Sequence, residues 1–295
     1  MSGLPRRACG ATGLSLPVLT FGAMRFEPHR IDERTGRDLL ACLFDLGVNA
    51  FHTSHEYESH DHFCAVLRSL GRREAVHVVK LGEPHFDHAG FRAARLVGIV
   101  EDHLRALGTE RIDVLQWLLR HTPLDDRFRL PLFEACREEV AATLARLVEA
   151  GKLGCVTVFP YTPAFAAAAL PLPWCEGLTT YLNPAERECV PFLDDMQRRG
   201  QAFLAIRPLF GGALADPSAP EAARYAAACE ALGVAPGARL AFALRYPLLH
   251  PAVSSIVLSV SSVERAHAAV AALEGIRPDQ PRFADVNRAF ALAGL

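Results

Sequence analysis

The sequence predicts a (β/α)8 barrel. Short apolar or β-branched runs alternate with amphipathic segments along the 295 residues, and this alternation is typical of a mostly parallel sheet with helical crossovers. Eight strand and helix pairs follow one another in the sequence, which is the number that closes a barrel. Because no glycine-rich phosphate turn follows the first strand, an open doubly wound sheet is disfavoured.

The expected strands are short and apolar, and helical patterns separate them. They are residues 16–22, 49–51, 75–80, 112–119, 155–159, 177–182, 202–207 and 254–259.

Helical periodicity predicts helices over residues 32–46 and 60–70 among others. A hairpin near residues 6–19 and a C-terminal helix near residues 283–292 are expected to flank the barrel. All of residues 1–295 are expected to form one domain.

Composition narrows the classes of function. The chain is 51% hydrophobic with a formal net charge of −2 and no basic stripe, so neither nucleic-acid nor anionic-membrane binding is expected. It has no signal-peptide pattern and no apolar run near the ~18 residues that cross a bilayer, which predicts a cytoplasmic protein. Eight cysteines without a C-x-x-C pair indicate reduced thiols rather than a zinc or iron–sulfur site.

The stretch FHTSHEYESHDHF at residues 51–63 follows the second expected strand, at the end of a barrel where active sites lie. His52 near the end of this strand and Lys80 at the end of the next one are therefore residues to inspect. The four histidines of this stretch raise the question of a metal. Polar residues are ordinary at a helix start and no H-E-x-x-H motif is present, so no metal is expected.

Several stretches occur in the order and at the spacing of the aldo-keto reductase family, which the sequence resembles over nearly its whole length. They are TGLSLPVLTFGAMRF, GVNAFHTSHEY, HVVKLG, ALGTERIDVLQW, EAGKLGCVTVF, RPLFGGAL and HPAVSSIVLSVSSVERAHAAV. The resemblance implies a barrel that binds NADPH or NADH across its mouth and reduces a small-molecule aldehyde or ketone. It also implies a tetrad of Asp, Tyr, Lys and His.

Half of that tetrad is present. By resemblance, Tyr57 protonates the carbonyl oxygen and Lys80 lowers the pKa of the tyrosine, while His52 stands at the aspartate position. Because an imidazole cannot supply the missing negative charge, the pKa of Lys80 is expected to fall.

The histidine position of the tetrad is occupied by Leu118. Arg120 and His121 follow closely enough along the chain to reach the same space. Either His52 or His121 is therefore expected to orient the substrate.

Several family positions that hold the cofactor are changed. Phe159 and Pro160 replace the Ser-Asn pair that binds the nicotinamide amide, and Ala268 and Ala269 replace the pair that recognises adenine. Because each missing hydrogen bond costs about 1 to 3 kcal/mol, weaker cofactor binding is expected.

Other cofactor positions are retained. The RPLFGG loop, with Arg207, Leu209 and Gly211, resembles the family loop that clamps the pyrophosphate, where glycine lets the backbone approach an anion. Ser262 and Arg265 are the candidate contacts to the adenosine phosphate.

Three functions remain open from the sequence. The first is NAD(P)H-dependent carbonyl reduction with Tyr57 as acid. The second is acid–base chemistry without nicotinamide, such as isomerisation, dehydration or cyclisation, with His52 and Tyr57. The third is a non-catalytic binding or regulatory protein on the same barrel.

Overall fold

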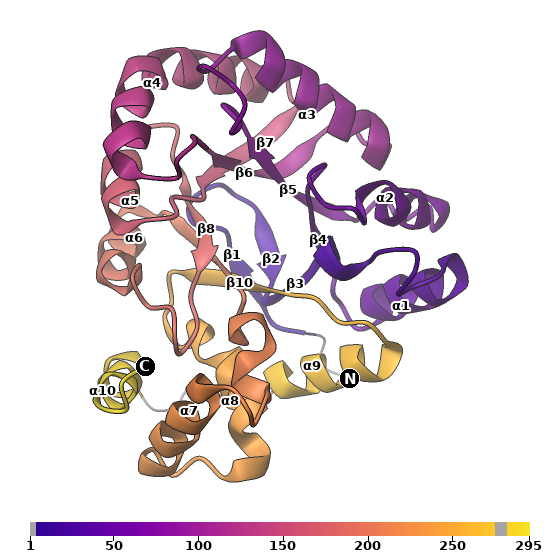
Figure 1. Cartoon of the computed structure of the whole chain (residues 1–295). Helices are drawn as coiled ribbons and strands as arrows, with labels where there is room; N and C mark the ends of the chain where they lie inside the picture. Colours follow the sequence, from indigo (N-terminus) through magenta and orange to yellow (C-terminus); the bar gives the residue numbers. More distant parts are fainter. Residues whose placement is uncertain (1–3, 275–281) are drawn as a thin grey trace.

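The structure is a closed barrel of eight parallel strands, which confirms the predicted fold. The computed structural model describes residues 4–274 and 282–295. The strands follow chain order around the barrel, and the last pairs with the first (Figure 1). They are β3 (Leu19–Gly22), β4 (Ala50–Thr53), β5 (Val76–Gly82), β6 (Ile112–Leu118), β7 (Leu153–Val158), β8 (Gly177–Tyr181), β9 (Ala202–Ile206) and β10 (Val253–Leu258).

Helices follow the strands and cover the outside of the barrel (Figure 1). The α-helices are α1 (Glu33–Asp45), α2 (His60–Ser69), α3 (Ala93–Leu107), α4 (Asp126–Glu149), α5 (Pro163–Ala169), α6 (Leu193–Arg199), α7 (Pro220–Ala231), α8 (Arg239–Arg245), α9 (Val263–Glu274) and α10 (Phe283–Leu292). The 3-10 helices are η1 (Ala23–Arg25), η2 (Val190–Phe192), η3 (Phe210–Ala215), η4 (Pro236–Ala238) and η5 (Pro247–Leu249).

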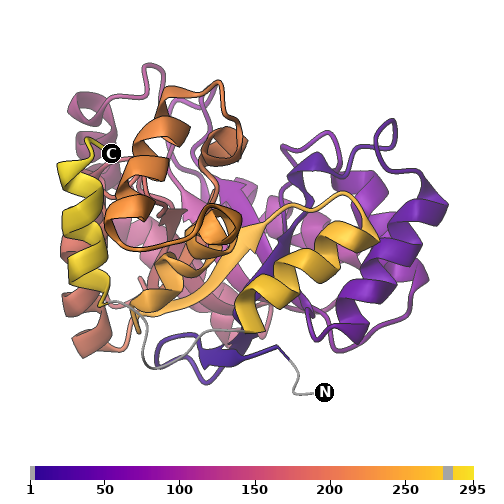
Figure 2. The same cartoon turned by 90° about the horizontal axis from the view of Figure 1, so that it is seen from below.

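A two-stranded hairpin covers the N-terminal end of the barrel. β1 (Arg6–Ala8) pairs with β2 (Ser15–Pro17), and Figure 2 shows the pair lying across one end of the barrel. The Ala11 N–H donates to the Gly200 carbonyl, just before β9, at 2.7 Å. Because the hairpin occupies the end where strands begin, the ends where strands finish remain available for a site.

The barrel interior changes from apolar to polar along the strands. Its apolar layer, next to the hairpin, consists of Cys9, Leu16, Ala50, Val78, Val114, Cys155, Ala202 and Leu204. Two residues beyond Val114 and Cys155 come the buried polar side chains of Gln116 and Thr157, and Thr157 bonds to Thr179 at 2.7 Å. Because such groups satisfy one another, the barrel can bury polar residues near its mouth.

Among the strand boundaries, the start of the first barrel strand differs most from the sequence prediction. Residues 15–17 belong to the hairpin strand β2, and only Leu19–Gly22 enters the barrel. Between them, the Val18 N–H donates to the Pro5 carbonyl, and the Val18 carbonyl accepts from the Ile256 N–H, both at 2.9 Å. The chain thus changes partners at Val18, which an unbroken apolar run does not reveal.

The expected helices at 32–46, 60–70 and 283–292 are confirmed to within one residue at each end by α1, α2 and α10. α1 begins where the Asp32 carboxylate accepts the Thr35 N–H at 2.7 Å, an N-cap contact. Among the described residues no single helix is both long and apolar enough to cross a bilayer, although Pro220–Ala231 with Pro236–Arg245, bent by 115°, meets the length and composition alone.

Two glycines of the hairpin turn provide a matched test of its docking. Gly10 and Gly13 have φ of +57° and +78°, but a Cβ at Gly10 would lie 2.3 Å from the Gly200 oxygen, whereas one at Gly13 would meet nothing within 4 Å. We expect Gly13→Ala to cost about 1 kcal/mol of unfolding free energy through backbone strain, and Gly10→Ala to cost at least ~2 kcal/mol more because the backbones must separate. Denaturant unfolding measures both, and equal losses would contradict the docking.

Candidate active site

His52 is a neutral, hydrogen-bonded residue near the end of β4. Gln116 Nε2 donates to the Thr179 carbonyl at 2.8 Å, so the Gln116 Oε1 atom, 2.6 Å from His52 Nε2, must be an acceptor. The network therefore assigns the proton to His52 Nε2. Burial, supplemented by the Lys80 charge, lowers the pKa of His52 to about 4 against the opposing effect of the Gln116 bond. His52 is thus uncharged at pH 7 and a weak base.

Lys80, near the end of β5, has its carboxylate partner in Glu56. Lys80 Nζ lies 2.9 Å from Glu56 Oε2, and the two side chains are 17% and 13% exposed. Burial lowers the pKa of Lys80, and Glu56 opposes that effect. The expected fall of this pKa is therefore present, but its main cause is burial, and the negative charge that His52 lacks is supplied by Glu56.

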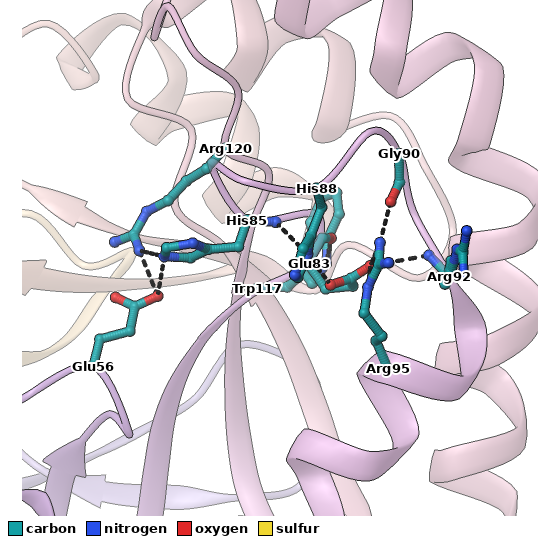
Figure 3. A network of polar contacts seen from close by, with 9 residues as sticks. All are labelled: Glu56, Glu83, His85, His88, Gly90, Arg92, Arg95, Trp117 and Arg120. Carbon is teal, nitrogen blue, oxygen red and sulfur yellow. Dashed lines mark hydrogen bonds and ion pairs between the residues drawn. The ribbon is translucent and has the colours of Figure 1, made fainter.

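Glu56 is held by a second cation. Its Oε1 atom accepts a hydrogen bond from Arg120 Nη1, as Figure 3 shows. Burial raises the pKa of Glu56, but Lys80 and Arg120 outweigh this and leave it below its usual value. The site thus contains an ionised carboxylate between two cations.

Arg120, which follows β6, joins this group from the other side of the mouth. Its Nε donates to the Tyr161 hydroxyl at 2.8 Å, and its Nη1 lies 3.0 Å from His85 Nε2. Because arginine only donates, His85 Nε2 is the acceptor in this contact. The guanidinium also stacks on Phe86, with its carbon 5.1 Å from the ring centroid.

Tyr57 lies beside Lys80, but not in the expected way. Lys80 Nζ lies over the Tyr57 ring, 4.9 Å from its centroid, and among the described residues no group bonds to the Tyr57 hydroxyl. Burial and the Glu56 charge raise the pKa of Tyr57, while Arg120 acts in the opposite direction. The pKa of Tyr57 is therefore shifted upward, opposite to the expected direction, and the phenol remains protonated throughout the neutral range.

His121 does not join the group. Its ring lies parallel to that of Phe128 in α4, with centroids 5.5 Å apart, and its buried Nδ1 has no hydrogen-bond partner within residues 4–274 and 282–295. Of the two residues beyond Leu118 that were candidates for this space, Arg120 reaches it.

The loop after β5 that carries His85 is fixed by a buried carboxylate (Figure 3). Glu83 Oε1 accepts from Arg95 Nε at 3.0 Å and from the Arg92 N–H at 2.9 Å. His88 Nδ1 lies 2.9 Å from Glu83 Oε2 and 3.1 Å from the backbone nitrogen of His85, so His88 links the loop that carries His85 to the buried carboxylate. The Glu83 network therefore positions His85, and with it the Arg120 guanidinium.

Arg207, in the predicted cofactor loop, is engaged within the protein. Its Nη1 donates to Glu186 at 2.9 Å, and its guanidinium carbon lies 5.0 Å and 5.2 Å from the ring centroids of Tyr181 and Phe210. Its backbone is left-handed, with φ of +57°. A phosphate would have to share or displace the Glu186 contact.

The glycine turn after Arg207 leaves backbone accessible. Gly211 and Gly212 have φ of +68° and +106°, and a Cβ at Gly212 would meet nothing within 4 Å. The Leu209 carbonyl accepts the Gly212 N–H at 2.9 Å, which fixes the turn. Such a turn allows close approach of an anion to the main chain.

Ser262 and Arg265 lie together at the start of α9. The Arg265 N–H donates to Ser262 Oγ at 3.3 Å and its guanidinium to Ser261 Oγ at 2.9 Å. Arg265 is exposed, so a solvent-accessible cation lies at a helix N-terminus, which favours anions.

The position expected to bind a nicotinamide amide is apolar. Phe159 packs edge-on against Tyr161 and Tyr181, with centroids 4.4 Å and 5.1 Å away. The nearby Asn183 amide donates to Glu186 Oε2 at 2.6 Å and to the Arg207 carbonyl at 2.9 Å. Phe159 thus offers no hydrogen bond at this position, and the Asn183 donors are already engaged.

The histidines of residues 51–63 divide into two groups. His52 faces the barrel interior, whereas His55 Nδ1 lies 3.1 Å from His103 Nε2 in α3, and the His60 and His103 rings are 4.8 Å apart. Burial, followed by the neighbouring histidines, lowers the pKa of His103 to about 3. In the described parts of the chain, no group of three or more His, Cys, Asp or Glu side chains has a geometry for a metal ion.

The residue that sequence reasoning missed is Glu56. It immediately precedes Tyr57, and β4 pairs with β5, the strand that carries Lys80. A carboxylate in the loop after one strand, beside a lysine near the end of the next, was the available signal. Together, a free tyrosine hydroxyl, a lysine and a carboxylate form a site that can give a proton to an oxygen and stabilise the resulting phenolate.

The sequence matches a known protein family over most of its length. A family model described as "Aldo/keto reductase family" matches residues 18–289. The L-glyceraldehyde 3-phosphate reductase of Escherichia coli (strain K12) is 26% identical over 228 residues, which are 70% of this chain and 62% of that protein. The chain thus matches less than two thirds of the length of this curated relative.

Solved structures with the same fold include the aldo-keto reductase AKR11C1 from Bacillus halodurans. Its apo form is 21% identical with a TM-score of 0.76, and its holo form is 20% identical with a TM-score of 0.72. Both comparisons cover 98% of this chain and 96% of that one. At this identity the likeness supports the fold.

The buried histidines predict a dependence of stability on pH. The pKa of His52 is about 4 and that of His103 about 3, below the ~6.5 of an unfolded histidine. The unfolded chain then binds more protons, so the free energy of unfolding should fall as the pH decreases from about 6.5 to 4, on the order of 3 kcal/mol for His52.

Denaturant unfolding between pH 7.5 and 5 measures this slope. His52→Asn should reduce the slope, whereas replacement of the exposed His29 by Asn should leave it unchanged. Retention of the full slope in His52→Asn would contradict the neutral, buried state of His52.

Proposed function

Because the chain belongs to the aldo/keto reductase family, we propose that it reduces the carbonyl group of a small aldehyde or ketone with NADPH or NADH. Tyr57 is the proposed proton donor and Lys80 its modulator. The observation that carries this proposal is the position of the Tyr57 hydroxyl, which has no hydrogen-bond partner in the described chain while Lys80 lies over the same ring at 4.9 Å. A substrate oxygen is the partner that this hydroxyl lacks.

The residues of the site suit the phosphate end of the cofactor better than its nicotinamide end. The Gly211–Gly212 turn and the Arg265 guanidinium at the start of α9 suit phosphate groups. At the other end, Phe159 is buried and gives no hydrogen bond to an amide, and the Arg207 guanidinium lies over the Tyr181 ring. The residues present therefore favour binding through the phosphates, with weaker fixation of the nicotinamide.

Proton transfer in this proposal follows from the electrostatics. When bound, a reduced nicotinamide supplies the hydride that adds to the carbonyl carbon. As the C=O electron pair moves onto oxygen, that oxygen takes the Tyr57 proton. The positive charge of Lys80 then stabilises the phenolate.

His52 gives little support to nicotinamide-independent acid–base chemistry. A general base works best with a pKa near the working pH, whereas that of His52 is about 4 and its Nε2–H is bound to Gln116. His52 instead supports the barrel interior beside Lys80 through its bond to Gln116. A non-catalytic role is disfavoured by the ordered arrangement of Tyr57, Lys80 and Glu56.

The first substrates to test are small phosphorylated and unphosphorylated aldehydes, because the E. coli relative is named for L-glyceraldehyde 3-phosphate. We expect NADPH or NADH to quench protein fluorescence on titration and to be oxidised when an aldehyde is added. Absence of binding for both dinucleotides at millimolar concentration would refute the proposal.

Removal of the Tyr57 hydroxyl tests its role directly. We expect Tyr57→Phe to lower kcat by about 100-fold or more, the usual contribution of a general acid, without weakening dinucleotide binding. Tyr246→Phe is a matched control, because the Tyr246 hydroxyl bonds to Asn287 on α10. Equal rates for Tyr57→Phe and the wild type would show that another group supplies the proton.

A further inference from the structure

The carboxylate that pairs with Lys80 lies in the loop after β4 and not in the strand itself. Within the described residues Glu56 is the carboxylate that contacts Lys80, at 2.9 Å, and it comes from the loop that also carries Tyr57. Residue 52 of β4, where the resemblance places an aspartate, is a neutral imidazole that bonds to Gln116. In this chain the negative charge beside Lys80 therefore lies on Glu56 and not on residue 52 of β4.

The surroundings of Glu56 hold its carboxylate in one position. Arg120 binds the Oε1 atom and leaves Oε2 to Lys80. At the end of β5, a Cβ on Gly82 would lie 3.3 Å from Glu56 Oε1 and 3.6 Å from the Leu118 side chain, so glycine leaves room for the carboxylate. Leu118 itself borders the same space.

We propose that Glu56 is the positioning residue of this site: its carboxylate takes the place of an acidic residue at position 52, keeps Lys80 charged and holds it over the Tyr57 ring. Leu118 and Gly82 supply the space that the longer side chain needs, and Arg120 fixes its orientation. His52, buried beside the Lys80 charge, is neutral and leaves the negative charge of the site to Glu56.

This inference rests on the proposed function for its kinetic consequence only, since the charge of Lys80 can be measured without turnover. The sequence has two lysines, Lys80 and Lys152. Lysine labelled with 13C at Cε therefore gives two NMR signals, and Lys152, which pairs with Glu101 at 2.6 Å, is the internal reference. Titration of the full chain yields the pKa of Lys80 in each variant.

Glu56→Gln should lower the pKa of Lys80 by about 1 pH unit or more, because an opposite charge at this distance shifts a pKa by about 1 to 3 units. Glu58→Gln removes the same charge two residues away, from a side chain that is 76% exposed, and should leave Lys80 unchanged. Equal effects of the two changes, or no effect of Glu56→Gln, would overturn the proposal.

Moving the carboxylate from residue 56 to residue 52 tests whether Glu56 takes the place of an acid at residue 52. The double variant His52→Asp with Glu56→Gln should return the pKa of Lys80 to within about 0.5 pH unit of the wild type. The single variant Glu56→Asp should retain most of the effect of the carboxylate on the pKa of Lys80. Failure of the double variant to recover while it remains folded by circular dichroism would overturn the claim that Glu56 replaces residue 52.

The kinetic readout separates this inference from the proposed function. The alkaline limit of kcat/KM should move to lower pH in Glu56→Gln, in step with the Lys80 titration, and return in Glu56→Asp. An unchanged limit would overturn the inference while leaving carbonyl reduction in place. A protein that oxidises no NADPH or NADH, but whose Lys80 shifts as expected, would overturn the proposed function alone.

Discussion

The ion pair between Glu56 and Lys80 is the interaction on which the barrel mouth depends. Both side chains are largely buried, and a buried charge is costly unless it is paired. Lys80 cannot find its partner in the neutral His52, so the loop after β4 must bring Glu56 inward. That requirement fixes the path of the loop and, with it, the adjacent Tyr57.

The other polar contacts follow from this pair. Two carboxylates around one lysine would repel one another and raise the pKa of one of them, so a neutral imidazole at position 52 is compatible with Glu56, whereas a second acid is not. Arg120 balances the remaining lone pairs of Glu56 and is itself held by Tyr161 and His85. The buried Glu83 network then fixes His85 from behind.

The fold was readable from the sequence because its signals are local. Alternating strand and helix patterns predict the eight units and most boundaries, and the exception at Val18 arises because one apolar run serves two sheets. The positions of Tyr57 and Lys80 beside one another were also predictable, since β4 and β5 are neighbouring strands of the barrel.

The charged contacts of the site could not be predicted from the sequence. Which side chain turns toward Lys80 depends on burial and on contacts between loops far apart in sequence, such as Glu56 with Arg120. His121 illustrates the same point, because its stacking on Phe128 follows from the position of α4. Residue type and spacing identified Arg120 and His121 as candidates, and three-dimensional packing decided between them and added Glu56.

A double-mutant cycle of Glu56→Gln and Lys80→Met measures the central interaction most directly. Free energies of unfolding of the wild type, both single variants and the double variant give the coupling between the two charges. A buried, hydrogen-bonded pair predicts a coupling of roughly 1 to 3 kcal/mol, because each single change leaves one charge without its partner. Additive effects, within about 0.5 kcal/mol, would contradict the account.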